Sequence, residues 1–371
     1  MLRLKSTVLA VALIGASAST HANDLRINGF MSVGAGVLSN SDVTVNGFDD
    51  DMGYSADTMV GLQISKNVND STSATAQLVA RGNEDFNTEA AWAYITYSPD
   101  DNTDLRIGRL RSPFFYYSDF LEVGYAYNWI RPPEEVYRLD AFSSINGVDV
   151  TRRFTLGATD GSVQAYVGRA LEAFEVNGTP YELSLKNFAG LVVNLTHGNF
   201  GYRASAHTAD AYTDLVLGGT RDLDQVYGLA TLNGVGEDFA VDGKTSHFYE
   251  MAATWDNGDI SAIAEVTSFQ QKTATFLDDI AALYSVAKRF DNTTIHLTYT
   301  SKRDIKESNS TVSAIQSLLE QHSTSWIIGA RYDYDAGTAF KFEVQRIDEK
   351  INSGAEGETG MLYSAALDLV F

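Results

Sequence analysis

The chain has 371 residues, a formal net charge of −21 and no cysteine. This acidity excludes a general nucleic-acid binder, because phosphate contacts need clustered lysine and arginine. The absence of cysteine excludes disulfides, thiolate metal sites and cysteine nucleophiles. Beyond the N-terminus the sequence contains no apolar run of the roughly 20 residues that a membrane helix needs. A membrane protein with this sequence would therefore have to cross the membrane with strands.

The first 22 residues have the three-part layout of a secretory signal peptide. A basic start at residues 1–5 precedes an apolar core at residues 8–14 and small residues at 20–22. We expect cleavage after Ala22, with cleavage after Ala18 as the alternative. The mature protein, residues 23–371, is therefore predicted to be exported.

From residue 24 onward the dominant pattern is strict alternation of apolar and polar residues. In the first such segment Leu25, Ile27 and Val33 share one face, whereas Arg26 and Ser32 share the other. Alternation over ten or more residues is the signature of a strand. Strands of about 9–11 residues have the length that a tilted transmembrane strand requires, whereas globular strands are typically ~5–6 residues long. Strand length therefore favours a membrane barrel over a soluble sandwich.

Short polar turns alternate with long acidic loops along the chain. The predicted turns lie at residues 67–70, 99–103, 160–161, 197–199, 256–259, 291–293 and 335–337. The predicted loops lie at residues 39–57, 82–87, 111–146, 172–181, 212–243, 272–281, 304–322 and 351–358, and apolar spacing predicts short helices at 276–283 and 312–319. Short connections at one end and long ones at the other are typical of outer-membrane barrels. We therefore predict one all-β domain, a transmembrane antiparallel β-barrel of about 16 strands.

The longest segment without a repeating pattern lies between strand patterns at residues 105–109 and 148–153. A segment of this length is uncommon inside a compact domain and is usually functional. We predict that residues 105–153 form a strand, a long third loop folded into the lumen, and a returning strand. In this interpretation the loop sets the width and charge of a pore.

The polar faces of the strands would line the lumen if the apolar faces point to lipid. The charges placed at the predicted constriction are Arg26, Arg81, Arg106 and Arg153 on the wall, and Glu134, Glu135 and Asp140 on the loop. A basic wall that faces an acidic loop would create a field across the pore, and such charge patterns screen solutes. The alternative is that the arginines pair with loop carboxylates and hold the loop in place. Alternation from Ile107 points Arg109 toward lipid, unless a bulge at Gly108 turns it inward.

Aromatic side chains are dense in the predicted third loop. Tyr117, Tyr125, Trp129 and Tyr137 could line the lumen as a stacking track for sugars or aromatic acids. They could instead pack the loop against the barrel wall, which is the favoured interpretation.

With these residues in view, the chain resembles the general diffusion porins of Gram-negative outer membranes. The resemblance covers the whole mature sequence in layout, including the Gly108-Arg109 pair that ends the fifth strand, the long third loop and the terminal Phe371. It implies a homotrimer, a third loop that forms the constriction, an Arg109 that faces the lumen, and a Phe371 that the barrel-assembly machinery recognises. Of the Pro-Glu-Phe-Gly-Gly-Asp core that the family carries in this loop, only Pro133-Glu134 agrees, which leaves pore size and solute preference open.

Motifs of catalysis are missing from the sequence. It contains no Gly-x-Ser-x-Gly elbow, no phosphate-binding Gly-Lys-Ser/Thr loop and no histidine pair at metal-ligand spacing. We expect no catalysis, no cofactor and no metal. The expected partners are outer-membrane lipid and lipopolysaccharide. The expected function is passive diffusion of small hydrophilic solutes and ions. A substrate-selective channel that uses the aromatic loop, and an exported adhesive or structural β protein, are the alternatives.

Overall fold

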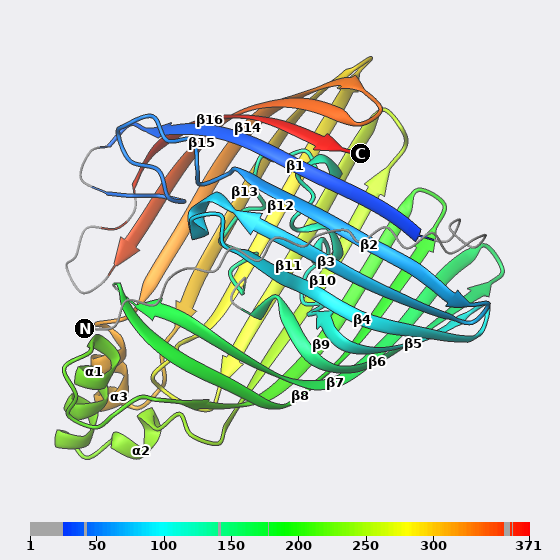
Figure 1. The fold of residues 1–371 in the computed structure, drawn as a ribbon. Helices are drawn as coiled ribbons and strands as arrows, with labels where there is room; N and C mark the ends of the chain where they lie inside the picture. The colour runs from blue at the N-terminus through cyan, green and yellow to red at the C-terminus, as the bar shows by residue number, and fades with distance from the viewer. Residues whose placement is uncertain (1–24, 41–42, 140–141, 177, 352–356, 358) are drawn as a thin grey trace, which may run out of the picture.

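Sixteen antiparallel strands close into one barrel in the computed structural model, which describes residues 25–40, 43–139, 142–176, 178–351, 357 and 359–371 (Figure 1). Each strand pairs with its neighbours in the chain, and β1 pairs with β16 to close the barrel. The strands are β1 (Leu25–Leu38), β2 (Met59–Asn69), β3 (Thr72–Arg81), β4 (Thr88–Asp100), β5 (Thr103–Arg111), β6 (Ser144–Leu156), β7 (Thr159–Val176), β8 (Thr179–His197), β9 (Phe200–Thr213), β10 (Lys244–Asp256), β11 (Ile260–Gln271), β12 (Asp278–Phe290), β13 (Thr293–Ile305), β14 (Gln321–Asp335), β15 (Thr338–Ile351) and β16 (Thr359–Val370). The predicted fold class is confirmed. The predicted signal peptide, residues 1–22, lies outside the described residues.

Short helices occupy several of the long loops. Within the described residues they are α1 (Asp222–Leu232), α2 (Gly236–Phe239) and α3 (Ser310–Gln316), with the 3-10 turns η2 (Gly82–Glu84), η3 (Ser118–Phe120) and η4 (Gly124–Ala126). The three α-helices pack together around Ala230, Phe239 and Val312, at the barrel end that carries the long loops (Figure 1). No helix in the described part of the chain has the length and apolar character needed to cross a membrane.

Six of the seven predicted turns lie where the structure places them; the seventh turn, one predicted loop and one predicted helix were wrong. The turn predicted at residues 160–161 lies at Gly157, whose positive φ of 63° suits glycine. The loop predicted at residues 172–181 is a strand hairpin, because β7 continues to Val176 and β8 begins at Thr179. The helix predicted at residues 276–283 is the start of β12, since a short apolar run fits both periods. The helix predicted at 312–319 is confirmed in part by α3.

The barrel wall is apolar outside and polar inside. Ile107, Met251 and Ile328 are exposed on the outer face, whereas Glu265 and Lys341 are buried on the inner face. A water-soluble protein shows the reverse distribution, and a buried charge requires a partner. The partners come from within the barrel.

The two chain ends meet at the strand that closes the barrel. The backbone of Phe371 exchanges two hydrogen bonds with Gly29, of 2.7 and 3.0 Å. The Phe371 ring occupies the position of a side chain at residue 29, since a Cβ there would lie 2.3 Å from the ring. Glycine at position 29 therefore leaves room for the Phe371 ring in its present position.

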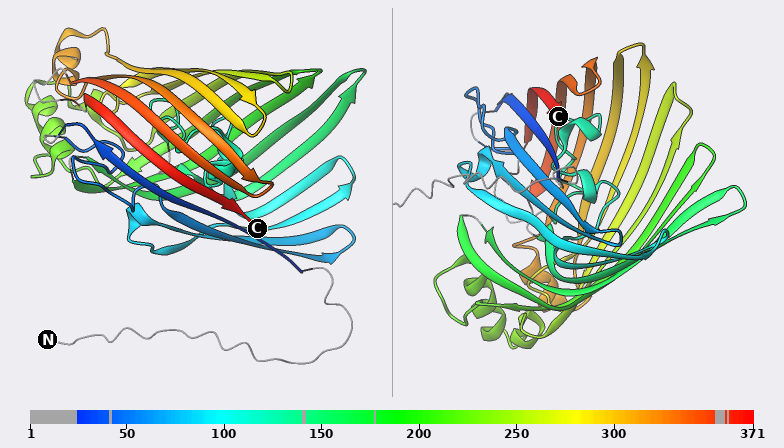
Figure 2. Two further views of the ribbon diagram at one scale, coloured as in Figure 1. Left: turned by 90° about the horizontal axis from the view of Figure 1, so that it is seen from above. Right: turned by 45° about the vertical axis from the view of Figure 1, so that its right-hand side comes forward.

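The segment between β5 and β6 lies inside the barrel, as predicted (Figure 2). Its described residues are 112–139 and 142–143, and we refer to it as the third loop. The aromatic cluster that it forms with the wall includes Phe115, Trp129 and Tyr137, all of which are buried. The third loop thus supplies the core that a hollow barrel lacks.

Candidate functional site

The first part of the third loop is bound to β9 and β11. Arg203 on β9 donates a hydrogen bond of 2.5 Å to the carbonyl oxygen of Pro113. The carboxylate of Glu265 on β11 accepts two hydrogen bonds, from the Tyr116 amide at 2.9 Å and from the Tyr137 hydroxyl at 2.6 Å. Burial, followed by the charge of Glu265, raises the pKa of Tyr137, so the hydroxyl remains a donor. Glu265 therefore connects two distant points of the loop to one strand.

The middle of the third loop is bound to β13, β14 and β15. Trp129 Nε1 donates to Thr298 Oγ1 at 2.8 Å, and the Ile130 amide donates to Glu343 at 3.0 Å. Arg331 donates to the carbonyl oxygens of Tyr125 and Tyr127 at 2.7 and 2.9 Å. Lumenal charges of the wall are thus used to fix the loop backbone.

Lys341 on β15 is a fully enclosed anchor of the loop. Its Nζ donates to the carbonyl oxygens of Gly124 and Trp129, both at 2.6 Å, and lies 2.8 Å from Asp368 Oδ2 on β16. The side chains of Lys341 and Asp368 are 0% and 1% exposed, so this ion pair has no direct contact with solvent. Ser32 on β1 donates a further hydrogen bond of 2.6 Å to Asp368.

The last part of the third loop is bound to the segment before β2, to β12 and to β14. Arg131 pairs with Asp57 and Arg138 pairs with Asp279, each through two hydrogen bonds. Glu135 accepts hydrogen bonds from the hydroxyl groups of Ser323 and Ser325 on β14. Arg131 also donates to Ser364 on β16 at 2.9 Å, so the loop is attached to strands from β9 around to β16.

Near the start of the third loop, Glu122 is held between two arginines. Its Oε1 lies 2.9 Å from Arg111 at the end of β5 and 2.6 Å from Arg81 at the end of β3. Burial acts to raise the pKa of Glu122, but the two guanidinium groups outweigh it and hold the pKa below its ordinary value. Arg81, which was predicted to line the constriction wall, therefore contacts the loop directly.

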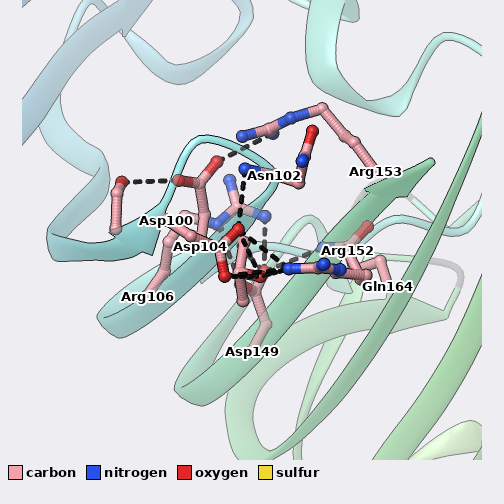
Figure 3. A network of polar contacts seen from close by, with 10 residues as sticks. Asp100, Asn102, Asp104, Arg106, Asp149, Arg152, Arg153 and Gln164 are labelled. Carbon is pink, nitrogen blue, oxygen red and sulfur yellow. Dashed lines mark hydrogen bonds and ion pairs between the residues drawn. The ribbon is translucent and has the colours of Figure 1, made fainter. Parts of the chain in front are cut away.

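The wall formed by β4 to β7 carries a network of ion pairs and hydrogen bonds between its own strands (Figure 3). Arg106 Nε donates to both oxygens of Asp149 at 2.9 and 3.0 Å, and Gln164 donates to the same carboxylate at 2.8 Å. Arg153 lies 2.8 Å from Asp104 on β5. Arg106 and Arg153 of the predicted basic wall therefore form their ion pairs with carboxylates on neighbouring wall strands.

The structure does not bring the predicted loop carboxylates to the arginine wall. Glu135 is buried against β14, and Glu134 is exposed in a polar cavity of about 310 Å³ that Lys302 and Glu349 also line. Asp140 lies outside the described residues. The loop carboxylate that interacts with Arg106 is instead that of Asp119, which is exposed on η3.

Two other arginines that were predicted to line the constriction, Arg109 and Arg26, do not contact the third loop in the described residues. Arg109 pairs in register with Ala93 and Asn146, which places it on the outward parity of Ile107. Gly108 has a φ of 139°, yet the pairing continues through it without a register shift, so no bulge turns Arg109 inward. Arg26 lies at the short-turn end of the barrel, where it is exposed and donates to Asn67 at 3.4 Å.

The predicted aromatic residues of the loop mainly pack against one another. The Tyr117 ring lies 5.6 Å from that of Trp129 and 6.5 Å from that of Tyr137, and the latter two are buried. Tyr125 lies beneath the Arg331 guanidinium, 4.5 Å from ring centre to Cζ. This arrangement supports the packing interpretation. Among the residues that the structure describes, no three acidic or histidine side chains converge as a metal site.

Comparison with known proteins identifies the fold. No family model matches the sequence, and no curated protein sequence matches it either. A loop-deletion variant of the Vibrio cholerae outer membrane protein OmpT has 12% identity and a TM-score of 0.61, covering 94% of this chain and 99% of that one. Salmonella typhi OmpF in complex with daunomycin has 13% identity and a TM-score of 0.57, covering 94% and 97%. The anion-selective porin from Comamonas acidovorans has 12% identity and a TM-score of 0.55, covering 94% and 99%.

Proposed function

We propose that this protein is an outer-membrane porin that forms a water-filled channel for passive diffusion of small hydrophilic solutes and ions. The observation that carries the proposal is the inverted barrel, apolar outside and charged inside, with one loop crossing its lumen. An apolar outer band matches a lipid environment, and lumenal charges are the usual means by which pores screen solutes. The similar barrel from Comamonas acidovorans is itself a porin.

The proposed path for solutes runs between the third loop and the wall formed by β2 to β6. The loop is bound to strands from β9 to β16 and its aromatic core packs on that side, whereas Glu122 joins it to Arg81 and Arg111 at the ends of β3 and β5. The charge of Asp119 on the loop acts on Arg106 on β5. We propose these two residues as the constriction pair. Arg81, Glu122 and Arg153 then extend the charged lining above and below it.

The remaining expectations belong to the same proposal. The protein would be exported by its signal peptide, inserted through recognition of Phe371 by the barrel-assembly machinery, and assembled as a homotrimer in contact with lipopolysaccharide. No catalytic role is proposed. The buried positions of Trp129 and Tyr137 favour a general channel over one selected by an aromatic track.

Planar-bilayer recording tests the proposed function. We expect stepwise openings in groups of three from the refolded chain. Neutralising Asp119 with Asp119→Asn should shift ion selectivity toward anions, whereas the matched change Glu135→Gln should leave selectivity unchanged, because Glu135 is buried against β14. Folded protein that gives no openings would contradict the channel and favour an adhesive or structural role.

A further inference from the structure

A cavity of about 250 Å³ lies between the third loop and the wall formed by β8 to β11. Its lining is apolar, in contrast to the charged surfaces elsewhere in the lumen. Phe114 from the loop, Leu185 and Phe188 from β8, Phe248 from β10 and Phe276 beside β12 all border it. We refer to it as the apolar cavity.

The rings around the apolar cavity hold one another in place. The ring of Phe114 lies 5.7 Å from that of Phe188 and 5.2 Å from that of Phe248, in stacked and edge-to-face arrangements. Aromatic pairs at such distances stabilise each other beyond the effect of buried area. Apolar cavities of roughly 150 Å³ remain dry and admit a benzene-sized molecule. The apolar cavity therefore has the size and lining for a small aromatic ligand.

One buried polar group on the cavity wall lacks a partner. His207 on β9 is 4% exposed, and its Nδ1 lies 2.7 Å from the Tyr166 hydroxyl. Its Nε2 has no hydrogen-bond partner in the described part of the chain. Elsewhere on the cavity wall, Ser246 donates to Gln271 at 3.4 Å. An unpaired buried nitrogen is costly, so a ligand that satisfies it gains specificity.

We propose that the apolar cavity binds a small hydroxylated aromatic compound of the phenol class, with its ring among the phenylalanines and its hydroxyl on His207 Nε2. A hydroxyl group both donates and accepts, so it pairs with either tautomer of the imidazole. This site goes beyond diffusion of hydrophilic solutes, because it gives the lumen a place for an apolar one. Arg138 borders both the apolar cavity and the polar cavity at Glu134, so a bound ligand lies beside the aqueous lumen.

Fluorine NMR with 4-fluorophenol tests the proposal on the whole mature chain refolded in detergent micelles, with protein-free micelles subtracted. We expect saturable binding to the unaltered protein. Ala209→Phe and Ala211→Phe place a ring in the cavity, which both alanines line, and should abolish binding. Ala287→Phe is the matched control, because Ala287 is equally buried in the lumen but lines a different cavity. Resistance to SDS before heating reports folding of each variant.

The role of His207 is tested with a second probe, 4-fluorotoluene, which has the same ring without the hydroxyl. The unaltered protein should bind it about tenfold more weakly than 4-fluorophenol, as expected for one lost hydrogen bond. In His207→Phe the preference should disappear. Equal signals from the unaltered protein and the folded Ala209→Phe variant, or no saturable binding by the folded unaltered protein, would overturn the site. Equal affinity for both probes would overturn the hydroxyl contact. These binding results are independent of ion conduction, so they stand apart from the channel proposal.

Discussion

Lys341 provides the sharpest test of how the third loop is held. Replacing it by methionine, Lys341→Met, keeps the length of the side chain but removes the donor to Gly124 and Trp129 and the partner of Asp368. Asp368 would then be a buried carboxylate with Ser32 as its remaining donor. Breaking a buried ion pair in this way costs about 3–5 kcal/mol. We therefore expect the free energy of unfolding to fall by that amount.

The assay is urea unfolding in lipid vesicles, followed by tryptophan fluorescence, together with single-channel recording. The double variant Lys341→Met/Asp368→Leu should recover about 1–3 kcal/mol relative to the single variant, because no unpaired charge remains. The matched control is Lys288→Met, whose exposed pair with Asp259 contributes about 0–1 kcal/mol. Current through Lys341→Met should fluctuate more, since the loop loses an anchor. A loss below about 1 kcal/mol, with an unchanged current, would refute the reasoning.

Three further predictions follow from the wall and the loop. Gly29→Val should lower stability by about 1–3 kcal/mol and slow barrel closure in refolding assays, because the Phe371 ring occupies the side-chain position. Gly108→Ala should cost about 1–3 kcal/mol in urea unfolding, because φ is 139° and a Cβ would lie 2.3 Å from the Ala93 oxygen. The pKa of Glu122 is lowered in the folded protein, so its stabilising contribution is present above its unfolded pKa and is lost as pH falls through its folded pKa. Channel current should therefore fluctuate more in acid, below the ordinary glutamate pKa of about 4.3.

Each of these predictions has its own contradiction. Normal refolding of Gly29→Val would show that the Phe371 ring can move aside. An unaltered urea midpoint of unfolding for Gly108→Ala would show that the β5 backbone can relax around the added methyl group. For the pH effect the comparison is Glu122→Gln, which should fluctuate equally at pH 3 and pH 7. A variant that retained the acid sensitivity would assign it to another carboxylate.

The strand walls could be predicted from the sequence because alternation is a local property. Lumenal positions such as Glu265, Arg331 and Lys341 follow from the parity of their own strands and are buried in the barrel interior. The β7–β8 hairpin was missed because residues 172–181 mix charges with Pro180 and resemble a loop. Pairing with a neighbouring strand overrides the low strand propensity of these residues, and such pairing cannot be read from one segment alone.

The path of the third loop could not be predicted, because it depends on contacts more than a hundred residues apart. Glu134 and Glu135 were the obvious acidic residues, yet Glu135 binds β14 rather than an arginine. Asp119 lies between Ser118 and Phe120 and belongs to no motif that would distinguish it. For Arg109, simple alternation agrees with the observed register.

The side of the third loop along which solutes pass is the central claim, and cysteine accessibility tests it most directly. The chain has no cysteine, so Asp119→Cys and Ser325→Cys each introduce a single thiol. Asp119 is exposed and belongs to the proposed constriction pair, whereas Ser325 is buried and donates a hydrogen bond to Glu135 of the loop. A charged methanethiosulfonate reagent added during single-channel recording should reduce the current through Asp119→Cys and leave Ser325→Cys unchanged. A reduced current in Ser325→Cys with no change in Asp119→Cys would contradict the account.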